Sequence, residues 1–182
     1  MTLQEIITSI PKDYWESYKT FLYAEPIKAK AMASCTAYLF GDILSQLSGG
    51  KNFGTLDRWR AVRAGAFGAG FHGFTRHFYY QWLDNQFDAQ GWSQISWIWA
   101  PKVILDDVVI LCLTYFLYIA WNGSFTGKSL KDMVAEYKST LPQTFKQGTR
   151  LWFPADSITY ALIPLEWRVI WVDACEIVWV LI

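Results

Sequence analysis

The sequence predicts an all-α membrane protein with four transmembrane helices and amphipathic surface helices, built as a single domain over residues 1–182. Three observations lead to this prediction. Hydrophobic residues make up 53% of the chain and aromatic residues 18%, including 11 tryptophans. Charged residues fall within or at the ends of long apolar segments. Residues 57–84 carry small side chains at a helical spacing that suits close packing of helices in lipid.

Charge and cysteine content exclude several classes of protein. The 16 basic and 16 acidic residues give a net charge of zero, so no global field favours nucleic acid as a partner. Three cysteines, Cys35, Cys112 and Cys175, lie far apart in apolar segments and form neither a disulfide framework nor a zinc motif. We therefore expect no metal and no other cofactor. The first 19 residues resemble neither a secretory signal nor a transit peptide, so any targeting signal is expected to be internal or to have been removed earlier.

The first two predicted elements are an amphipathic helix over residues 12–24 and a transmembrane span over 27–47. In the amphipathic helix, Tyr14 and Tyr18 lie on one apolar face. This pattern fits either an interfacial helix or an N-terminal helix packed on the bundle. Pro26 is compatible with the first turn of the span that follows.

The second span is predicted over residues 59–83. Small residues recur at every fourth position and form a ridge without bulk on a helix: Ala61, Gly65, Ala69 and Gly73. In water this pattern is unfavourable, since glycine costs about 1 kcal/mol relative to alanine inside a helix. In lipid it lets two helices approach closely, so we predict that the ridge packs against another helix. Arginines at one end of the span and aromatic residues at the other mark the membrane interfaces.

The second half of the chain predicts two further spans, over residues 101–121 and 164–182, with a surface helix over 129–147 between them. Ser129 is a suitable N-cap for the surface helix, and Pro142 is expected to break or kink it. The last span is barely long enough to cross a bilayer.

Motifs distributed along the chain are similar to those of a known family. In the first half these residues are Trp15, Tyr18, Pro26, Gly41-Asp42 and Gln46, followed by Asp57-Arg58, Arg63, Gly73, His77, Tyr80 and Leu83. In order and spacing they resemble the Mpv-seventeen / peroxisomal-membrane-protein-twenty-two (Mpv17/PMP22) family of small four-span organellar membrane proteins. Each motif contains only two or three residues, so the resemblance depends on their order and spacing together.

The second half both matches the family pattern and departs from it. Its matching residues are Lys102, Asp106, Trp152, Ile163-Pro164, Arg168 and Trp179. Two aspartates, Asp107 and Asp156, stand where the family pattern has glutamine. Cys112 stands where the pattern has proline, and the loss of that proline predicts a straighter third helix.

Polar residues inside the apolar segments are the candidate functional residues. A mid-bilayer Arg, Lys or Asp costs at least about 2.5 kcal/mol, so such groups normally face inward or pair. We therefore predict an intramembrane polar network of Asp42, Gln46, Arg63, His77, Lys102, Asp106, Arg168, Asp173 and Glu176. This network is either a set of ion pairs that orients the helices or a polar pathway through the bundle.

Two further patterns match cofactor sites poorly. Gly68-x-Gly70-x-x-Gly73 formally fits a dinucleotide fingerprint, but arginines rather than a strand precede it. His72 and His77 are five residues apart and do not share a helix face as a zinc pair would. No Ser–His–Asp order and no pair of general acids emerges from the sequence, so we expect that the protein is not an enzyme.

The resemblance implies more about function than composition does. The family is associated with the mitochondrial inner membrane, peroxisomes and plastids, and with proposed roles as a nonselective pore and in organelle homeostasis. It implies a multi-pass protein of the mitochondrial inner membrane, or alternatively of a peroxisomal or plastid membrane, with a channel-like or homeostatic role. An alternative is a structural accessory subunit of a large respiratory or photosynthetic complex. A third is a pigment-carrying plastid subunit with His72 or His77 as ligand. Expected partners are membrane lipids and other membrane-protein subunits or a second copy of the chain, and no nucleic acid.

Overall fold

The computed structural model describes residues 12–92 and 96–181, which form helices joined by short turns, without a strand among them. Two of the helical segments are continuous through π-helical turns, and we call them the second and the third rod after the second and third predicted spans. The elements in order are α2 (Lys12–Ala24), α3 (Pro26–Ser48), the second rod α4–η1–α5 (Arg58–Phe67, Gly68–Gly73, Phe74–Ala89), the third rod α6–η3–α7 (Trp99–Leu105, Asp106–Ile110, Leu111–Phe125), α8 (Leu130–Ala161) and α9 (Arg168–Trp179).

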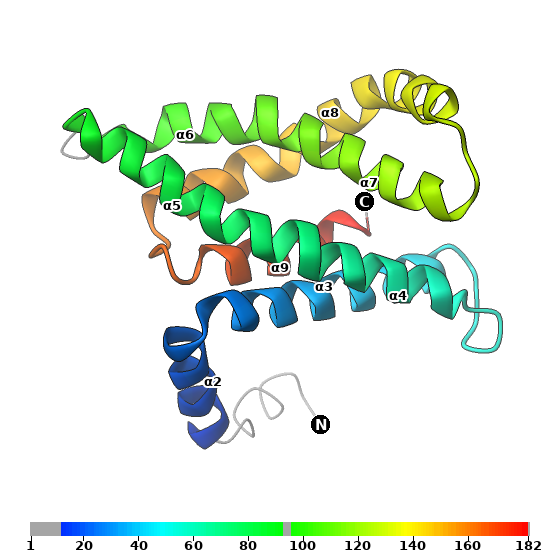
Figure 1. Cartoon of the computed structure of the whole chain (residues 1–182), viewed down its shortest axis with the longest axis horizontal. Helices are drawn as coiled ribbons and strands as arrows, with labels where there is room; N and C mark the ends of the chain where they lie inside the picture. The colour runs from blue at the N-terminus through cyan, green and yellow to red at the C-terminus, as the bar shows by residue number, and fades with distance from the viewer. Residues whose placement is uncertain (1–11, 93–95, 182) are drawn as a thin grey trace.

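Successive long elements run in opposite directions and pack into one bundle (Figure 1). α3 packs against α4, η1 and α9, while α8 packs against the third rod and α9. α9 therefore packs against both α3 and α8. Two groups of buried side chains form the core: Tyr80, Leu83, Val103, Tyr160, Val169 and Val172 in one, and Tyr38, Ala64 and Phe67 in the other.

α2 stands at a steep angle to α3 (Figure 1) and contacts the bundle through aromatic side chains. Trp15 stacks on Trp167, with ring centroids 5.2 Å apart. Tyr14 and Tyr23 remain exposed. The helix therefore combines a packing contact with an exposed aromatic surface, and both interpretations of its amphipathic pattern remain compatible with it.

Local sequence explains where several helices begin and turn. Asp57 caps α4 by accepting a hydrogen bond from the backbone N–H of Arg60. Ser129 and Asp132 form a reciprocal capping box at the start of α8, in agreement with the predicted N-cap. Gly127, in the turn before α8, has a φ of 69°, which favours glycine because other residues are strained there.

Two rods contain a π-helical turn, in which residues five apart rather than four apart lie on one face. In the second rod this turn is the glycine-rich stretch Gly68–Gly73. In the third rod it is Asp106–Ile110. The sequence predicted a straighter third helix because Cys112 replaces a proline. That prediction took account only of the proline and missed this interruption of the regular helix.

The helix boundaries correct the predicted second half. The second rod continues beyond residue 83 to Ala89. The predicted surface helix over 129–147 is only the beginning of α8, which passes through Pro142 and Pro154 and ends at Ala161. Figure 1 shows the first turns of α8 nearly end-on and the remainder from the side, so the helix changes direction along its length. A proline inside a helix is an ordinary cause of such a bend.

The prediction of a final transmembrane span over residues 164–182 is wrong, because the helix in this region is too short to cross a bilayer. α9 has 12 residues, and at 1.5 Å per residue it is ~18 Å long, well short of the ~30 Å hydrocarbon core. Pro164 disfavours helical backbone at the residue before it, and a turn occupies the positions up to Trp167. Ile182, the last residue of the predicted span, lies outside the described residues.

One continuous helix of the described residues, Trp99–Phe125, is both long enough and apolar enough to cross a membrane by length and composition alone. The other long elements are long enough but less apolar. The all-α fold class is thus confirmed for the described part of the chain, whereas the number of spans is not fixed by composition.

Candidate functional site

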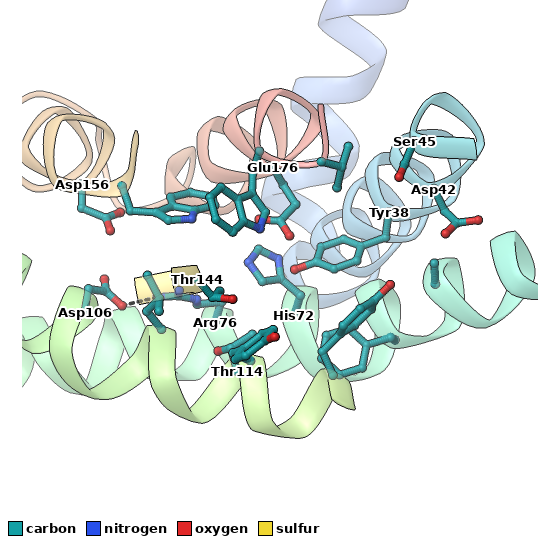
Figure 2. Close-up of a pocket in the computed structure, with 18 of the residues that line it drawn as sticks. Tyr38, Asp42, Ser45, His72, Arg76, Asp106, Thr114, Thr144, Asp156 and Glu176 are labelled. Carbon is teal, nitrogen blue, oxygen red and sulfur yellow. Dashed lines mark hydrogen bonds and ion pairs between the residues drawn. The ribbon is translucent and has the colours of Figure 1, made fainter. Parts of the chain in front are cut away.

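A cavity of about 200 Å³ lies inside the bundle (Figure 2). Side chains from α3, the second and third rods, α8 and α9 all line it. Asp42 and Arg60 mark one end, and Asp106 and Asp156 mark the other. The lining contains five carboxylates but only two guanidiniums and one imidazole, and its aromatic members are Tyr38, Phe67, Tyr115, Tyr118, Trp152 and Trp179. The cavity is therefore both aromatic and predominantly acidic.

At the Asp106 end, three aspartates have different surroundings. Asp106 accepts hydrogen bonds from the guanidinium of Arg76 and the hydroxyl of Tyr160. Asp107 and Asp156 are each only 4% exposed. Within the described residues, neither carboxylate oxygen of Asp107 has a hydrogen-bond partner, and neither does Oδ1 of Asp156. Arg76 thus forms an ion pair with Asp106, whereas Asp107 and Asp156 form none within the described residues.

The centre of the cavity is organised around His72. Its Nδ1 lies 3.1 Å from Oδ1 of Asp173 and 3.5 Å from Oγ of Ser34. Ser34 in turn donates to Oδ2 of Asp173 at 2.8 Å. These contacts fix the imidazole, which projects into the cavity beside Tyr38 and Glu176 (Figure 2).

The opposite end is closed by a polar cluster around Asp42 and Gln46. Arg60 donates to Oδ1 of Asp42 at 2.7 Å, and the amide of Gln46 donates to Oδ2 at 2.7 Å. The same amide donates to the carbonyl of Asp57 at 3.0 Å, while its oxygen accepts from the N–H of Asp57 at 2.8 Å and from Lys51 at 2.9 Å. Gln46 therefore ties the end of α3 to the loop that leads into α4.

Two further polar contacts join helices away from the cavity lining. Asp84 in the second half of α5 accepts hydrogen bonds from Lys102 at 2.6 Å and from Arg168 at 2.8 Å. Nζ of Lys30 on α3 lies 3.2 Å from Nδ1 of His77 on α5. The first contact links three elements through one carboxylate, and the second links two helices through neighbouring nitrogen atoms.

Comparison with known proteins supplies relatives along most of the chain. The sequence profile of the Mpv17 / PMP22 family matches residues 123–182. PXMP2/4 family protein 4 of Dictyostelium discoideum is 28% identical over 165 residues, which cover 89% of this chain and 86% of that protein. Mitochondrial inner membrane protein Mpv17 of Homo sapiens is 24% identical over 166 residues, which cover 91% of this chain and 92% of that protein. The resemblance to the Mpv17 / PMP22 family expected from the sequence is thus confirmed along most of the chain.

Relatives within the Mpv17 / PMP22 family carry names from two organelles. Peroxisomal membrane protein 2 of Bos taurus is 22% identical over 175 residues, which cover 93% of this chain and 87% of that protein. The human relative is named for the mitochondrial inner membrane instead. No solved structure matches the chain.

The predicted polar residues do not form one continuous network in the structure. Asp42, Asp106 and Glu176 line the cavity, while Gln46 and Asp173 contact residues of the lining. Lys102 and Arg168 meet at Asp84, and His77 contacts Lys30. The predicted set therefore divides into a cavity group and two separate contacts between helices.

Arg63 joins none of these groups. Its guanidinium lies over the ring of Phe125, with Cζ 5.5 Å from the ring centroid. Its carbonyl oxygen accepts a hydrogen bond from the indole of Trp121. Both contacts join the second rod to the end of α7.

The small residues of the second rod approach α3, but not with a constant period. A β-carbon on Gly65 would lie 3.2 Å from the carbonyl oxygen of Cys35, and Ala61 is buried. Ala69 is only half-buried. The tightest approach is at Gly68, whose β-carbon would overlap the carbonyl group of Ser34. The π turn explains this change, because it places Gly68 and Gly73, five residues apart, on the face toward α3.

Several residues of the site were outside the predicted set: Arg60, Arg76, Asp84, Asp107 and Asp156. Arg76 and Asp107 were recognisable from sequence as charges within apolar segments, but their partners were not. Asp84 was missed because the second span was predicted to end at residue 83, whereas α5 continues to Ala89. Asp156 carried a signal that went unused, namely an acid where the family pattern has glutamine.

Among the described residues, no three His, Cys, Asp or Glu side chains are grouped so that they could hold a metal ion. His72 and His77 each face a different partner, Asp173 and Lys30. The two histidines therefore do not form a joint ligand site.

Proposed function

We propose that the chain is an integral membrane protein of an organelle and crosses the bilayer with four helical elements. These are α3, the second rod, the third rod and the part of α8 that follows Pro142. The 23 residues of α3 span ~34 Å at 1.5 Å per residue, which exceeds the ~30 Å hydrocarbon core. The part of α8 from Pro142 to Ala161 contains about 20 residues and also reaches ~30 Å.

The first turns of α8 suit a position at the membrane surface. Lys131 and Lys138 are exposed on one side, whereas Met133 is buried against Gly123 of α7. A helix with cations on one side and apolar residues on the other lies well in the interface plane. In this arrangement α9 is too short to cross the bilayer and stays packed against α3 and α8.

The names of the relatives support two organelles, and we propose the mitochondrial inner membrane with the peroxisomal membrane as the alternative. Organelle fractionation of cells that express the tagged full chain would decide between them. Co-fractionation with inner-membrane markers, together with resistance to alkaline carbonate extraction, is the expected result. Recovery with peroxisomal markers would favour the alternative.

We further propose a channel-like role, which rests on the acidic cavity inside the bundle. Charged groups inside a membrane protein are costly and commonly mark routes for ions or polar solutes. Asp107 and Asp156 lack the compensating partners that a purely structural ion pair would have. Rings or rows of carboxylates favour cations over anions, so we expect cation preference.

A catalytic role is not part of this proposal. Ser34, His72 and Asp173 are close together, but Ser34 donates to Asp173 rather than to the imidazole. Its side chain is also fully buried, with 0% exposure. A serine nucleophile needs a base that accepts its proton and access to a substrate, and this arrangement supports neither.

Reconstitution of the purified full chain in planar bilayers tests the channel-like role. The expected result for the wild type is a conductance with cation preference. Replacing Asp107 or Asp156 by asparagine should reduce that preference and leave the melting temperature in detergent unchanged or higher, because each change removes an uncompensated buried charge. Asp88→Asn, at an exposed carboxylate on α5, is the matched control.

Asp106→Asn separates a role in conduction from a role in folding. This change strands Arg76, so it should lower stability by about 3 kcal/mol or more, as for other broken buried pairs. A wild type that never conducts and instead co-purifies stoichiometrically with a large membrane complex would overturn the channel-like role. So would cation preference that is identical in wild type, Asp107→Asn and Asp156→Asn.

A further inference from the structure

Two buried carboxylates at one end of the cavity have no evident structural purpose. Asp107 on η3 and Asp156 on α8 are each 4% exposed and line the same cavity. Within the described residues, Arg76 is the cation at this end, and it is bound to Asp106. A buried carboxylate without an ion-pair partner is destabilising, and a bound cation would compensate its charge.

Asp107 and Asp156 come from different helices, yet the fold brings them to one end of one cavity (Figure 2, in which Asp156 is labelled). Within the described residues, both carboxylate oxygens of Asp107 and Oδ1 of Asp156 lack a hydrogen-bond partner. These oxygen atoms are therefore available to accept hydrogen bonds from a bound molecule.

The walls next to these carboxylates are aromatic. Trp152 precedes Asp156 by one helical turn and lines the cavity with Trp179 of α9. The two indoles are close together, since a β-carbon on Gly148 would lie 3.6 Å from Trp152 and 3.7 Å from Trp179. Aromatic faces attract cations, and tryptophan does so most strongly.

The donor set favours an organic cation over a bare metal ion. Within the described residues there is no group of three side chains that could ligate a metal. Carboxylates combined with aromatic faces are instead the usual surroundings of ammonium groups in proteins. A primary ammonium has three N–H donors, which suits two carboxylates with free acceptor positions.

We propose that the Asp106 end of the cavity binds a small organic cation with primary ammonium groups, held by the carboxylates of Asp107 and Asp156 against the indole faces. The cavity volume of about 200 Å³ corresponds to about six or seven waters at ~30 Å³ each, and so accommodates a short alkyl diamine. This inference deepens the proposed channel-like role by naming the class of solute. Binding itself does not require conduction.

Calorimetric titration of the purified full chain in detergent with 1,4-diaminobutane tests this inference. Binding should be observed for the diamine and not for 1,4-butanediol, which has the same shape without charge. The double variant Asp107→Gln/Asp156→Gln should bind the diamine at least tenfold more weakly. Asp88→Gln, at an exposed position, should bind as the wild type does.

Magnesium chloride at matched ionic strength completes the test. If Mg²⁺ binds and the diamine does not, the site takes a metal and the inference is wrong. Equal heats for diamine and diol, or undiminished binding in the double variant, would also overturn it. If the double variant fails to fold, the wild-type protein alone decides the test, through the comparison of diamine binding with diol binding. If the chain conducts ions but binds no diamine, only this inference is wrong. If it binds the diamine but does not conduct, only the channel-like role is wrong.

Discussion

Gly73 of η1 packs directly on Ala31 of α3. A β-carbon on Gly73 would lie 2.8 Å from the Cα of Ala31 and 2.8 Å from the carbonyl oxygen of Lys30. Both neighbours are backbone atoms, so they cannot move aside by a change of rotamer. This contact therefore sets the distance between α3 and the second rod, the two elements that carry Asp42, His72 and Arg76 to the cavity.

Gly73→Ala is expected to lower the stability of the protein by about 1–3 kcal/mol, the usual cost of overpacking. The measurement is the thermal unfolding temperature in detergent. Gly70→Ala is the matched control, since a β-carbon on Gly70 would meet nothing within 4 Å. That control should be neutral or more stable by up to about 1 kcal/mol, because alanine favours helix. Equal unfolding temperatures for the two variants would contradict the close packing.

Asp84→Asn should destabilise the protein by about 3 kcal/mol, the low end of the range for a broken buried ion pair. The change removes the shared partner of Lys102 and Arg168. The low end applies because the Asp84 side chain keeps 21% exposure, and water can partly replace it. Asp88→Asn, one helical turn later on the exposed side of α5, controls for the loss of a charge. If both variants unfold at the same temperature, Asp84 does not join the three elements as its contacts indicate.

The sequence was informative about helices because apolar segments and caps act locally. Ser129 is recognisable as an N-cap from its own side chain and from Asp132 three residues later. The π turns were beyond such reasoning. The one in the second rod lies where Gly68 and Gly73 meet the backbone of α3, which is a tertiary contact.

Charged residues inside apolar segments could be identified from sequence, but their partners could not. The expense of burying Lys102 and Asp106 implied an opposite charge on another helix for at least one of them, but not which residue carries it. In the structure Lys102 binds Asp84 and Asp106 binds Arg76, both across helices. Spacing along one helix says nothing about which side chains of another helix face it, so pairing required the fold.

The Asp57 cap of α4 predicts a dependence of stability on pH. The backbone N–H of Arg60 donates to this carboxylate and holds its pKa below the usual value for aspartate. A carboxyl whose pKa is lowered by folding stabilises the fold above the pKa of the unfolded chain. That contribution is lost as the pH falls through the lower pKa of the folded state.

Asp57→Asn isolates this effect, because asparagine is an equally good N-cap and does not titrate. Unfolding temperatures measured between pH ~7 and pH ~3 should decline less in this variant than in the wild type. Asp132→Asn provides a comparison at the other capped helix, α8. A wild type and an Asp57→Asn variant with parallel pH profiles would show that the cap does not depend on charge.

The side chain of Gln46 both donates and accepts hydrogen bonds. We therefore predict that glutamate cannot replace it. Its amide nitrogen donates to Asp42 at 2.7 Å and to the carbonyl of Asp57 at 3.0 Å. A carboxylate has no N–H to donate, so Gln46→Glu would place oxygen against oxygen at both contacts. It would also add a negative charge beside Asp42. Lys51, which already contacts the Gln46 oxygen at 2.9 Å, would offset only part of this repulsion.

Gln46→Glu should therefore lower stability by about 1–3 kcal/mol for the acceptors left without a donor. Gln143→Glu makes the same substitution at an exposed position of α8 and should have little effect. Lowering the pH should narrow the difference between the two variants, because a protonated glutamate regains one O–H donor. Thermal unfolding in detergent at neutral and acidic pH measures both effects on the same samples. If Gln46→Glu and Gln143→Glu unfold at the same temperature at neutral pH, the donor role of Gln46 is wrong. If the difference in unfolding temperature persists unchanged at acidic pH, its cause is lost packing rather than a lost donor.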